Sequence, residues 1–143
     1  MSAPAILQPV VVLAAWTMVM WAWLYATRIP AMNKLGIDPD KLVRDSDLSL
    51  EKILPPEVRW KADNYNHLHE APTVFYAIAL LLAMVGQGDG FNATLAWGYV
   101  GLRIAHSLVQ ATVNKVMLRW ALFMASSLML IALILHAALT VFH

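Results

Sequence analysis

The chain has 143 residues, of which 60% are hydrophobic and 13% charged, and its mean hydropathy is +0.61. Soluble domains average about 25% charged residues, so the composition excludes an ordinary soluble protein and predicts an integral membrane protein. The net charge of +1 gives no sign of nucleic-acid binding. The lack of cysteine excludes disulfides, thiolate metal ligands and a cysteine nucleophile.

Four apolar segments in chain order predict an all-α, four-helix membrane bundle. The expected spans are 5–27, 58–86, 92–113 and 117–142, with a cytosolic loop over 28–57, in a single four-span domain of residues 1–143. At about 1.5 Å per residue, the first span is long enough to cross a hydrocarbon core of about 30 Å. The apolar part of the second, 72–85, has only about 14 residues, so this span must begin within the polar stretch before it. Arg28-Ile29-Pro30 is expected to end the first span. A short surface helix is expected over 47–52.

The second segment contains a proline within its apolar part. Pro55-Pro56-Glu57 suits the start of a helix that continues to Gly86. Pro72 then lies inside this helix and should kink it, which would free backbone carbonyls near Leu68 and His69.

The distribution of Lys and Arg predicts the orientation. Basic residues gather between spans one and two, and again between spans three and four: Arg28, Lys34, Lys41, Arg44, Lys52, Arg59 and Lys61, then Lys115 and Arg119. The turn around Asp89 and both termini have none. By the positive-inside rule, both basic loops should face the cytosol and both termini should face away from it.

The third segment carries a polar stripe. On a helical wheel its members fall within an arc of roughly 80°; they are Tyr99, Arg103, His106, Gln110 and Asn114. An arginine at the middle of a lone span costs at least about 2.5–3.5 kcal/mol. One or two polar residues could simply join helices, at about 1 kcal/mol per hydrogen bond. Five on one face, including an arginine, favour a polar cavity.

The second segment adds a matching polar face, because Asn64, His67 and Glu70 are spaced by three residues. A carboxylate at membrane depth needs a partner or a proton. Arg103 is a candidate partner for Glu70. The two residues are estimated to lie at different depths in the membrane, so a direct pair stays an open question. His67 and His69 point to different helix faces, so we expect no metal site.

Together these residues resemble the MAPEG family, membrane-associated proteins in eicosanoid and glutathione metabolism. The resemblance rests on Asn64, on the run from Glu70 through Pro72 to Tyr76, on the stripe from Tyr99 to Asn114, and on Arg119. It covers nearly the whole chain and is greatest for the bacterial, functionally uncharacterised branch. It implies a homotrimer in a bacterial inner membrane, with membrane lipid and lipophilic small molecules as further partners.

The resemblance also implies that glutathione binds as co-substrate in the cytosolic half, between neighbouring subunits. The expected glutathione-binding residues, carried over by motif or by a shared polar face, are Arg28, Asn64, His67, Glu70, Arg103, His106, Gln110 and Asn114. Arg119 is the expected catalytic residue, the nearest match to the arginine that stabilises the thiolate. Gln110 falls where several enzymes have a tyrosine.

The chain departs from the enzymes of the family at three points. Asp63 stands next to Asn64, where the enzymes usually carry an arginine. One residue separates Glu70 from Pro72 instead of two, and Arg119 follows Gln110 at a spacing about two residues too long.

The resemblance therefore implies a glutathione-dependent transferase or peroxidase acting on lipophilic electrophiles by thiolate attack. A guanidinium would lower the pKa of the thiol without losing its own proton. The departures motivate an alternative, a non-catalytic MAPEG-fold protein that binds lipid or a small anion in a basic intersubunit cavity. A third hypothesis is a small transporter or channel, but the sequence lacks the broken-helix repeats typical of transporters.

Overall fold

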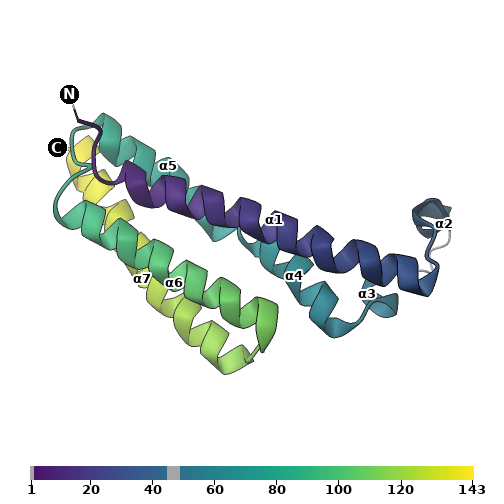
Figure 1. The fold of residues 1–143 in the computed structure, drawn as a ribbon. Coiled ribbons are helices and arrows are strands. Elements are labelled where there is room, and N and C mark those ends of the chain that lie inside the picture. Colours follow the sequence, from purple (N-terminus) through teal and green to yellow (C-terminus); the bar gives the residue numbers. More distant parts are fainter. Residues whose placement is uncertain (1, 45–48) are drawn as a thin grey trace.

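The computed structural model describes residues 2–44 and 49–143, and in these ranges the chain is helical without strands (Figure 1). Its helices are α1 (Leu7–Leu35), α2 (Pro39–Arg44), α3 (Leu50–Ile53), α4 (Pro56–His67), α5 (Ala71–Met84), α6 (Phe91–Thr112) and α7 (Val116–Val141). The prediction of an all-α protein is confirmed for this part of the chain.

In the described ranges, three helical stretches are long and apolar enough to cross a membrane. They are Leu7–Leu35, Pro56–Met84 and Val116–Val141, the second comprising α4 and α5. The remaining long helix, α6, has 22 residues and carries the polar stripe. Its buried face includes Arg103, His106 and Gln110, so the stripe points into the protein.

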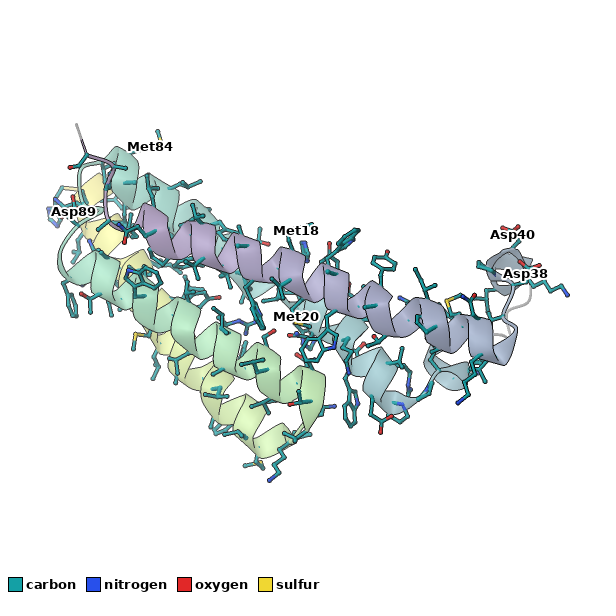
Figure 2. The ribbon with its side chains drawn as sticks, in the orientation of Figure 1. Met18, Met20, Asp38, Asp40, Met84 and Asp89 are labelled. Carbon is teal, nitrogen blue, oxygen red and sulfur yellow. The ribbon has the colours of Figure 1, made fainter. Side chains whose placement is uncertain are left out.

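The helices pack lengthwise. Helices α6 and α7 form an antiparallel hairpin, and α1 lies along α4, α5 and α6 (Figure 1). Asp89 and both termini lie at one end, and Asp38 and Asp40 near α2 at the other (Figure 2). The side chain of Met20 on α1 is fully buried, whereas Met18 is 55% exposed.

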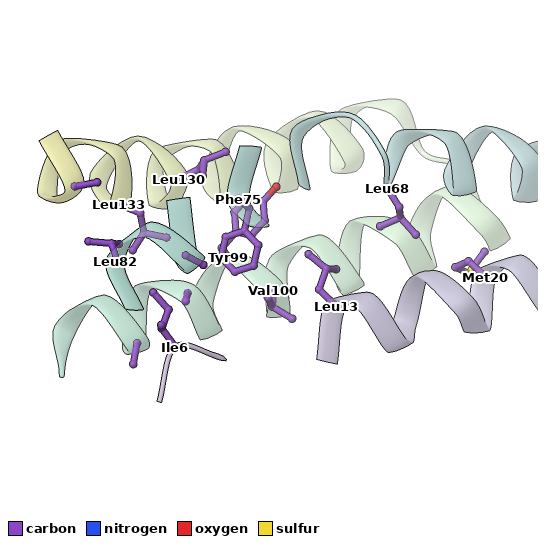
Figure 3. Packing of buried hydrophobic residues seen from close by; sticks show 14 of the residues in the cluster. Ile6, Leu13, Met20, Leu68, Phe75, Leu82, Tyr99, Val100, Leu130 and Leu133 are labelled. Atoms are coloured by element: carbon purple, nitrogen blue, oxygen red, sulfur yellow. The ribbon is translucent and has the colours of Figure 1, made fainter. Parts of the chain in front are cut away.

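A continuous apolar core joins these helices. Phe75 of α5 and Tyr99 of α6 stack at its centre, with ring centroids 4.6 Å apart (Figure 3). Leu82 and Leu133 extend the core toward the end with the termini, and Leu68 extends it toward α4. This core fixes α5 and α6 against each other next to the polar stripe.

Helix α1 extends beyond Arg28-Ile29-Pro30, where we expect the first membrane span to end. It continues through Pro30 to Leu35, and Gly36 ends it at φ 65°, with its N–H directed to the Asn33 and Met32 carbonyls. Pro30 removes the donor to the carbonyl of Ala26, and Ala26 is exposed, so water can replace that bond. The predicted loop 28–57 is therefore partly helical. Helix α3 overlaps the surface helix expected over 47–52, of which residues 47 and 48 lie outside the described ranges.

The expected kink at Pro72 is a complete break between two helices. Helix α4 ends at His67, and Pro72 lies in the first turn of α5 instead of inside a continuous helix. The proline ring excludes the carbonyl of residue 68. The chain crosses the break in a tight turn, in which the Glu70 N–H donates to the His67 carbonyl at 3.2 Å. Of the two carbonyls we expected to be freed, that of His69 accepts from the Thr73 hydroxyl at 2.6 Å.

Candidate functional site

A cavity of about 280 Å³, the main cavity, opens beside the break between α4 and α5. One part of its wall is polar and brings together predicted site residues from three helical stretches: His67, Glu70, Arg103, His106 and Arg119. The other part consists of Ala71 at the start of α5 and the apolar side chains of Val116, Trp120 and Phe123 on α7. A charged region and an apolar region thus share one small space.

Arg103 reaches this cavity from the middle of α6 and is only 3% exposed. Its Nη2 donates to the His67 carbonyl at 3.4 Å, a long hydrogen bond, and its Nε has no partner in the described chain. The break after His67 turns this carbonyl toward α6. Since the Arg103 guanidinium bonds the carbonyl and not Glu70, the structure does not support the direct Glu70–Arg103 pair that we considered.

Two further buried polar atoms of the cavity wall also have no partner in the described ranges. They are Nδ1 of His106, whose side chain is 5% exposed, and Nε of Arg119. An unsatisfied buried polar group costs about 1–3 kcal/mol. Three of them around one cavity indicate that the space holds water or a polar ligand.

Gln110 and Asn114 form hydrogen bonds to two residues of the cavity wall. The His67 Nδ1 donates to Oε1 of Gln110 at 3.0 Å. The Arg119 Nη1 donates to Oδ1 of Asn114 at 2.6 Å. Neither Gln110 nor Asn114 lines the cavity, so each holds a residue that does.

Asn114 also explains how Arg119 reaches the cavity despite its longer spacing from Gln110. Asn114 has φ 50° and directs its N–H to the Val109 carbonyl at 2.7 Å, which closes α6. Helix α7 then begins at Val116, and Arg119 extends from its first turn. The turn over 113–115 absorbs the extra residues.

Within one chain, Arg28 and Asn64 do not line this cavity. Arg28 lines a second cavity, of about 130 Å³, together with Val58, Asp63 and Asn66. Asn64 is 1% exposed, and its Nδ2 donates to the Ser107 hydroxyl at 2.6 Å. The structure therefore separates Arg28 from the arginines of the main cavity.

Comparison with protein families matches residues 6–139, nearly the whole chain, to the MAPEG family. The chain belongs to this family. No curated protein and no solved structure gives a significant match. MAPEG proteins are membrane proteins that form oligomers, and they include glutathione transferases and peroxidases as well as non-catalytic members. Family membership and the apolar helices together make this chain an integral membrane protein.

Ser107 lies next to the polar stripe of this MAPEG protein but was not among the predicted site residues. Its hydroxyl accepts from Nε1 of Trp16 at 2.8 Å and from Nδ2 of Asn64 at 2.6 Å, so it joins α1 and α4 to α6. On a helical wheel Ser107 lies about 20° beyond the edge of the stripe. A wider arc would have included it.

The sequence also did not predict a structural role for Lys61. It is 9% exposed, its Nζ donates to the carbonyls of Glu57 at 2.9 Å and Ala111 at 3.2 Å, and it lies 5.1 Å from the centre of the Trp23 ring. The Ala111 carbonyl belongs to the last turn of α6, which favours a nearby cation. Lys61 lies three residues before Asn64, on the same side of α4, and this spacing could have predicted its role.

The apolar cavity wall could have been found from spacing as well. Val116, Trp120 and Phe123 follow the i, i+4, i+7 pattern of one helix face. In an apolar span, however, this pattern does not separate a cavity wall from a lipid-facing surface.

Proposed function

We propose that this MAPEG protein is a glutathione-dependent transferase or peroxidase that acts on lipophilic electrophiles or hydroperoxides. The observation that carries the proposal is the main cavity, where Arg103 and Arg119 each present an Nε without a partner in the described chain. The family supplies the ligand, because its enzymatic members use glutathione.

The two arginines suit thiolate chemistry. The thiolate of glutathione is the nucleophile, and a neighbouring guanidinium lowers the pKa of the thiol while keeping its own proton. In a transfer reaction the sulfur forms a bond to carbon and the leaving group departs with the electron pair. In a peroxidase reaction the sulfur attacks one oxygen, the O–O bond breaks, and the alcohol and a sulfenic acid form. A second glutathione then yields the disulfide and water. No protein nucleophile is needed.

The apolar wall suits a substrate that arrives from the bilayer. Trp120 is 58% exposed and Val116 is 68% exposed in the single chain. A lipophilic electrophile can therefore reach the sulfur along α7 without crossing water. This arrangement favours lipid-soluble substrates over polar ones.

A homotrimer of four-span subunits accounts for the separation of Arg28 from the main cavity. The spans are α1, α4 with α5, α6 and α7, with both termini away from the cytosol. The main cavity, at about 280 Å³, is slightly smaller than typical small-molecule pockets, which measure about 300–1,000 Å³. A neighbouring subunit would enlarge it and could contribute its own Arg28, so that glutathione binds between subunits.

Calorimetry of glutathione binding to the detergent-solubilised protein tests this proposal. We expect Arg103→Ala and Glu70→Ala to lose binding, and Lys34→Ala, on the exposed end of α1, to retain it. Absence of binding in well-folded wild-type protein would reject the proposed function.

One observation favours the non-catalytic alternative, a protein that binds lipid or a small anion. Asp63 lines the second cavity with Arg28 and places a carboxylate next to Asn64, where the family's enzymes usually carry an arginine. Glutathione turnover that disappears in Arg119→Ala would exclude this alternative.

A further inference from the structure

Two helices begin at the main cavity, and in the described structure the cap residue of neither makes a side-chain capping hydrogen bond. Ala71 is the first residue of α5, Val116 is the first residue of α7, and both line the cavity. Neither Glu70 nor Lys115, the preceding cap residues, makes a side-chain capping hydrogen bond. The first N–H groups of a helix have no partner within the helix. The start of α7 therefore offers N–H donors and a partial charge of about +0.5 to whatever occupies the space. In α5, Pro72 has no N–H and the Thr73 N–H donates to the Glu70 carbonyl at 3.1 Å, so this helix offers its partial charge and the Ala71 N–H.

The side chains of the cavity add a net positive charge. Among the arginines and carboxylates of its lining, Arg103 and Arg119 contribute two positive charges and Glu70 one negative charge. Glu70 is exposed, whereas Arg103 is 97% buried, since its exposed fraction is 3%. One formal positive charge and two helix ends thus remain without an anionic partner among the described residues. This balance suits a single negative charge.

The buried polar atoms of the wall give independent support for a ligand. Arg103 and His106 are each more than nine-tenths buried, both line the cavity, and Nε of Arg103 and Nδ1 of His106 have no partner in the part of the chain described. A guanidinium N–H needs an acceptor. An anion satisfies it better than a neutral group, because charge-assisted hydrogen bonds are roughly twice as strong.

We propose that, without thiol, this cavity binds a small monovalent inorganic anion such as chloride. The anion is held by Arg103, by Arg119 and by the uncapped N-termini of α5 and α7. A second part of the inference rests on the proposed function: the anion occupies the position of the thiolate, so chloride competes with glutathione.

Chloride binding can be measured without glutathione, from the excess line width of the ³⁵Cl NMR signal of the full-length protein in detergent, with gluconate as the exchange anion. We expect excess line width for the wild type and its loss in Arg103→Gln and in Arg119→Gln. Lys34→Gln removes the same charge from the exposed end of α1 and should leave the signal unchanged. Wild-type protein that is folded but gives no excess line width, or an equal loss in Lys34→Gln, would overturn the proposal.

The role of α7 is tested by Lys115→Ser against Lys115→Ala. Both remove the same exposed charge, but serine at the cap position accepts from the first-turn N–H groups and stabilises the helix. The donors of α7 are then occupied, and the helix end no longer supports the anion. We expect chloride to bind about 2- to 5-fold more weakly to Lys115→Ser than to Lys115→Ala. Equal affinities would show that α7 does not contribute.

The two proposals can fail separately. Chloride binding in a protein that does not bind glutathione would leave the anion site standing and reject the proposed function. Glutathione binding in a protein without chloride binding would do the reverse. If both ligands bind, the apparent Kd for glutathione should rise linearly with chloride concentration from its chloride-free value. A Kd independent of chloride would reject the shared position.

Discussion

Asn114 illustrates how one residue serves both the fold and the site. It ends α6 at φ 50° and holds Arg119 through a hydrogen bond of 2.6 Å. Asn114→Gly keeps the backbone conformation and loses the hydrogen bond, which contributes about 1 kcal/mol. We expect glutathione turnover to fall about 5-fold while thermal stability changes little. Asn114→Ala should show the same fall in turnover and a further loss of stability of about 1–2 kcal/mol, because alanine is strained at positive φ. Turnover of Asn114→Gly equal to that of the wild type would restrict Asn114 to its role in ending α6.

Ser107 carries the connection between α1, α4 and α6. Ser107→Ala leaves Nε1 of Trp16 and Nδ2 of Asn64 without their acceptor, and Ser107 itself is fully buried. Each orphaned donor costs about 1–3 kcal/mol, so we expect a clear loss of stability in thermal unfolding. Ser126→Ala is the matched control, because the Ser126 hydroxyl is also buried but bonds only the Phe123 carbonyl three residues away. Equal effects of the two substitutions would contradict the role of Ser107.

The N-terminal segment is fastened to the turn between α5 and α6. The Ile6 N–H donates to the Gly88 carbonyl at 2.8 Å, and the Ala5 N–H donates to Asp89 at 2.8 Å. A Cβ at Gly88 would lie 2.7 Å from Cβ of Pro4 and 3.1 Å from Cα of Ala83. Gly88→Ala should therefore destabilise the protein by about 1–3 kcal/mol in thermal unfolding.

Gly101→Ala provides the comparison for Gly88→Ala. A Cβ at Gly101 would meet nothing within 4 Å, and alanine is favoured over glycine inside a helix such as α6 by about 0.5–1 kcal/mol. We expect this variant to be as stable as the wild type or slightly more stable. A Gly88→Ala variant as stable as the wild type would contradict the close packing of the N-terminal segment against Gly88.

The sequence predicted the helices better than their ends. Apolar runs mark the helical stretches, and the wheel correctly placed Arg103 and His106 on the buried face of α6. The break before Pro72 was underestimated, because a proline can kink a helix or begin a new one, and only packing selects between them. The separation of Arg28 from the main cavity could not be predicted, since it depends on how α1 packs along α4 and α6.

The orientation of the whole molecule stays a prediction that the chain is well suited to test. Because it has no cysteine, single cysteines can be introduced without background labelling. We expect Gln87→Cys, at the end with the termini, to react with a membrane-impermeant maleimide on intact cells. Lys34→Cys, at the opposite end of α1, should react only after the cytosolic face is opened. Labelling in the opposite order would reverse the orientation inferred from the basic residues.

Assembly can be tested through the separation of the two arginine sites. Arg28 lies in one cavity of the chain and Arg119 in another, so a site that needs both must draw them from different subunits. Arg28→Gln and Arg119→Gln should each abolish glutathione turnover as homo-oligomers. When the two variants are co-expressed and purified through different tags, some interfaces combine an intact Arg28 from one subunit with an intact Arg119 from its neighbour. We expect these mixed oligomers to recover part of the wild-type turnover, whereas mixing Arg103→Gln with Arg119→Gln, both altered in the same cavity, should recover none. Failure of the first mixture to recover turnover, with mixed assembly shown by the double purification, would mean that each subunit holds a complete site.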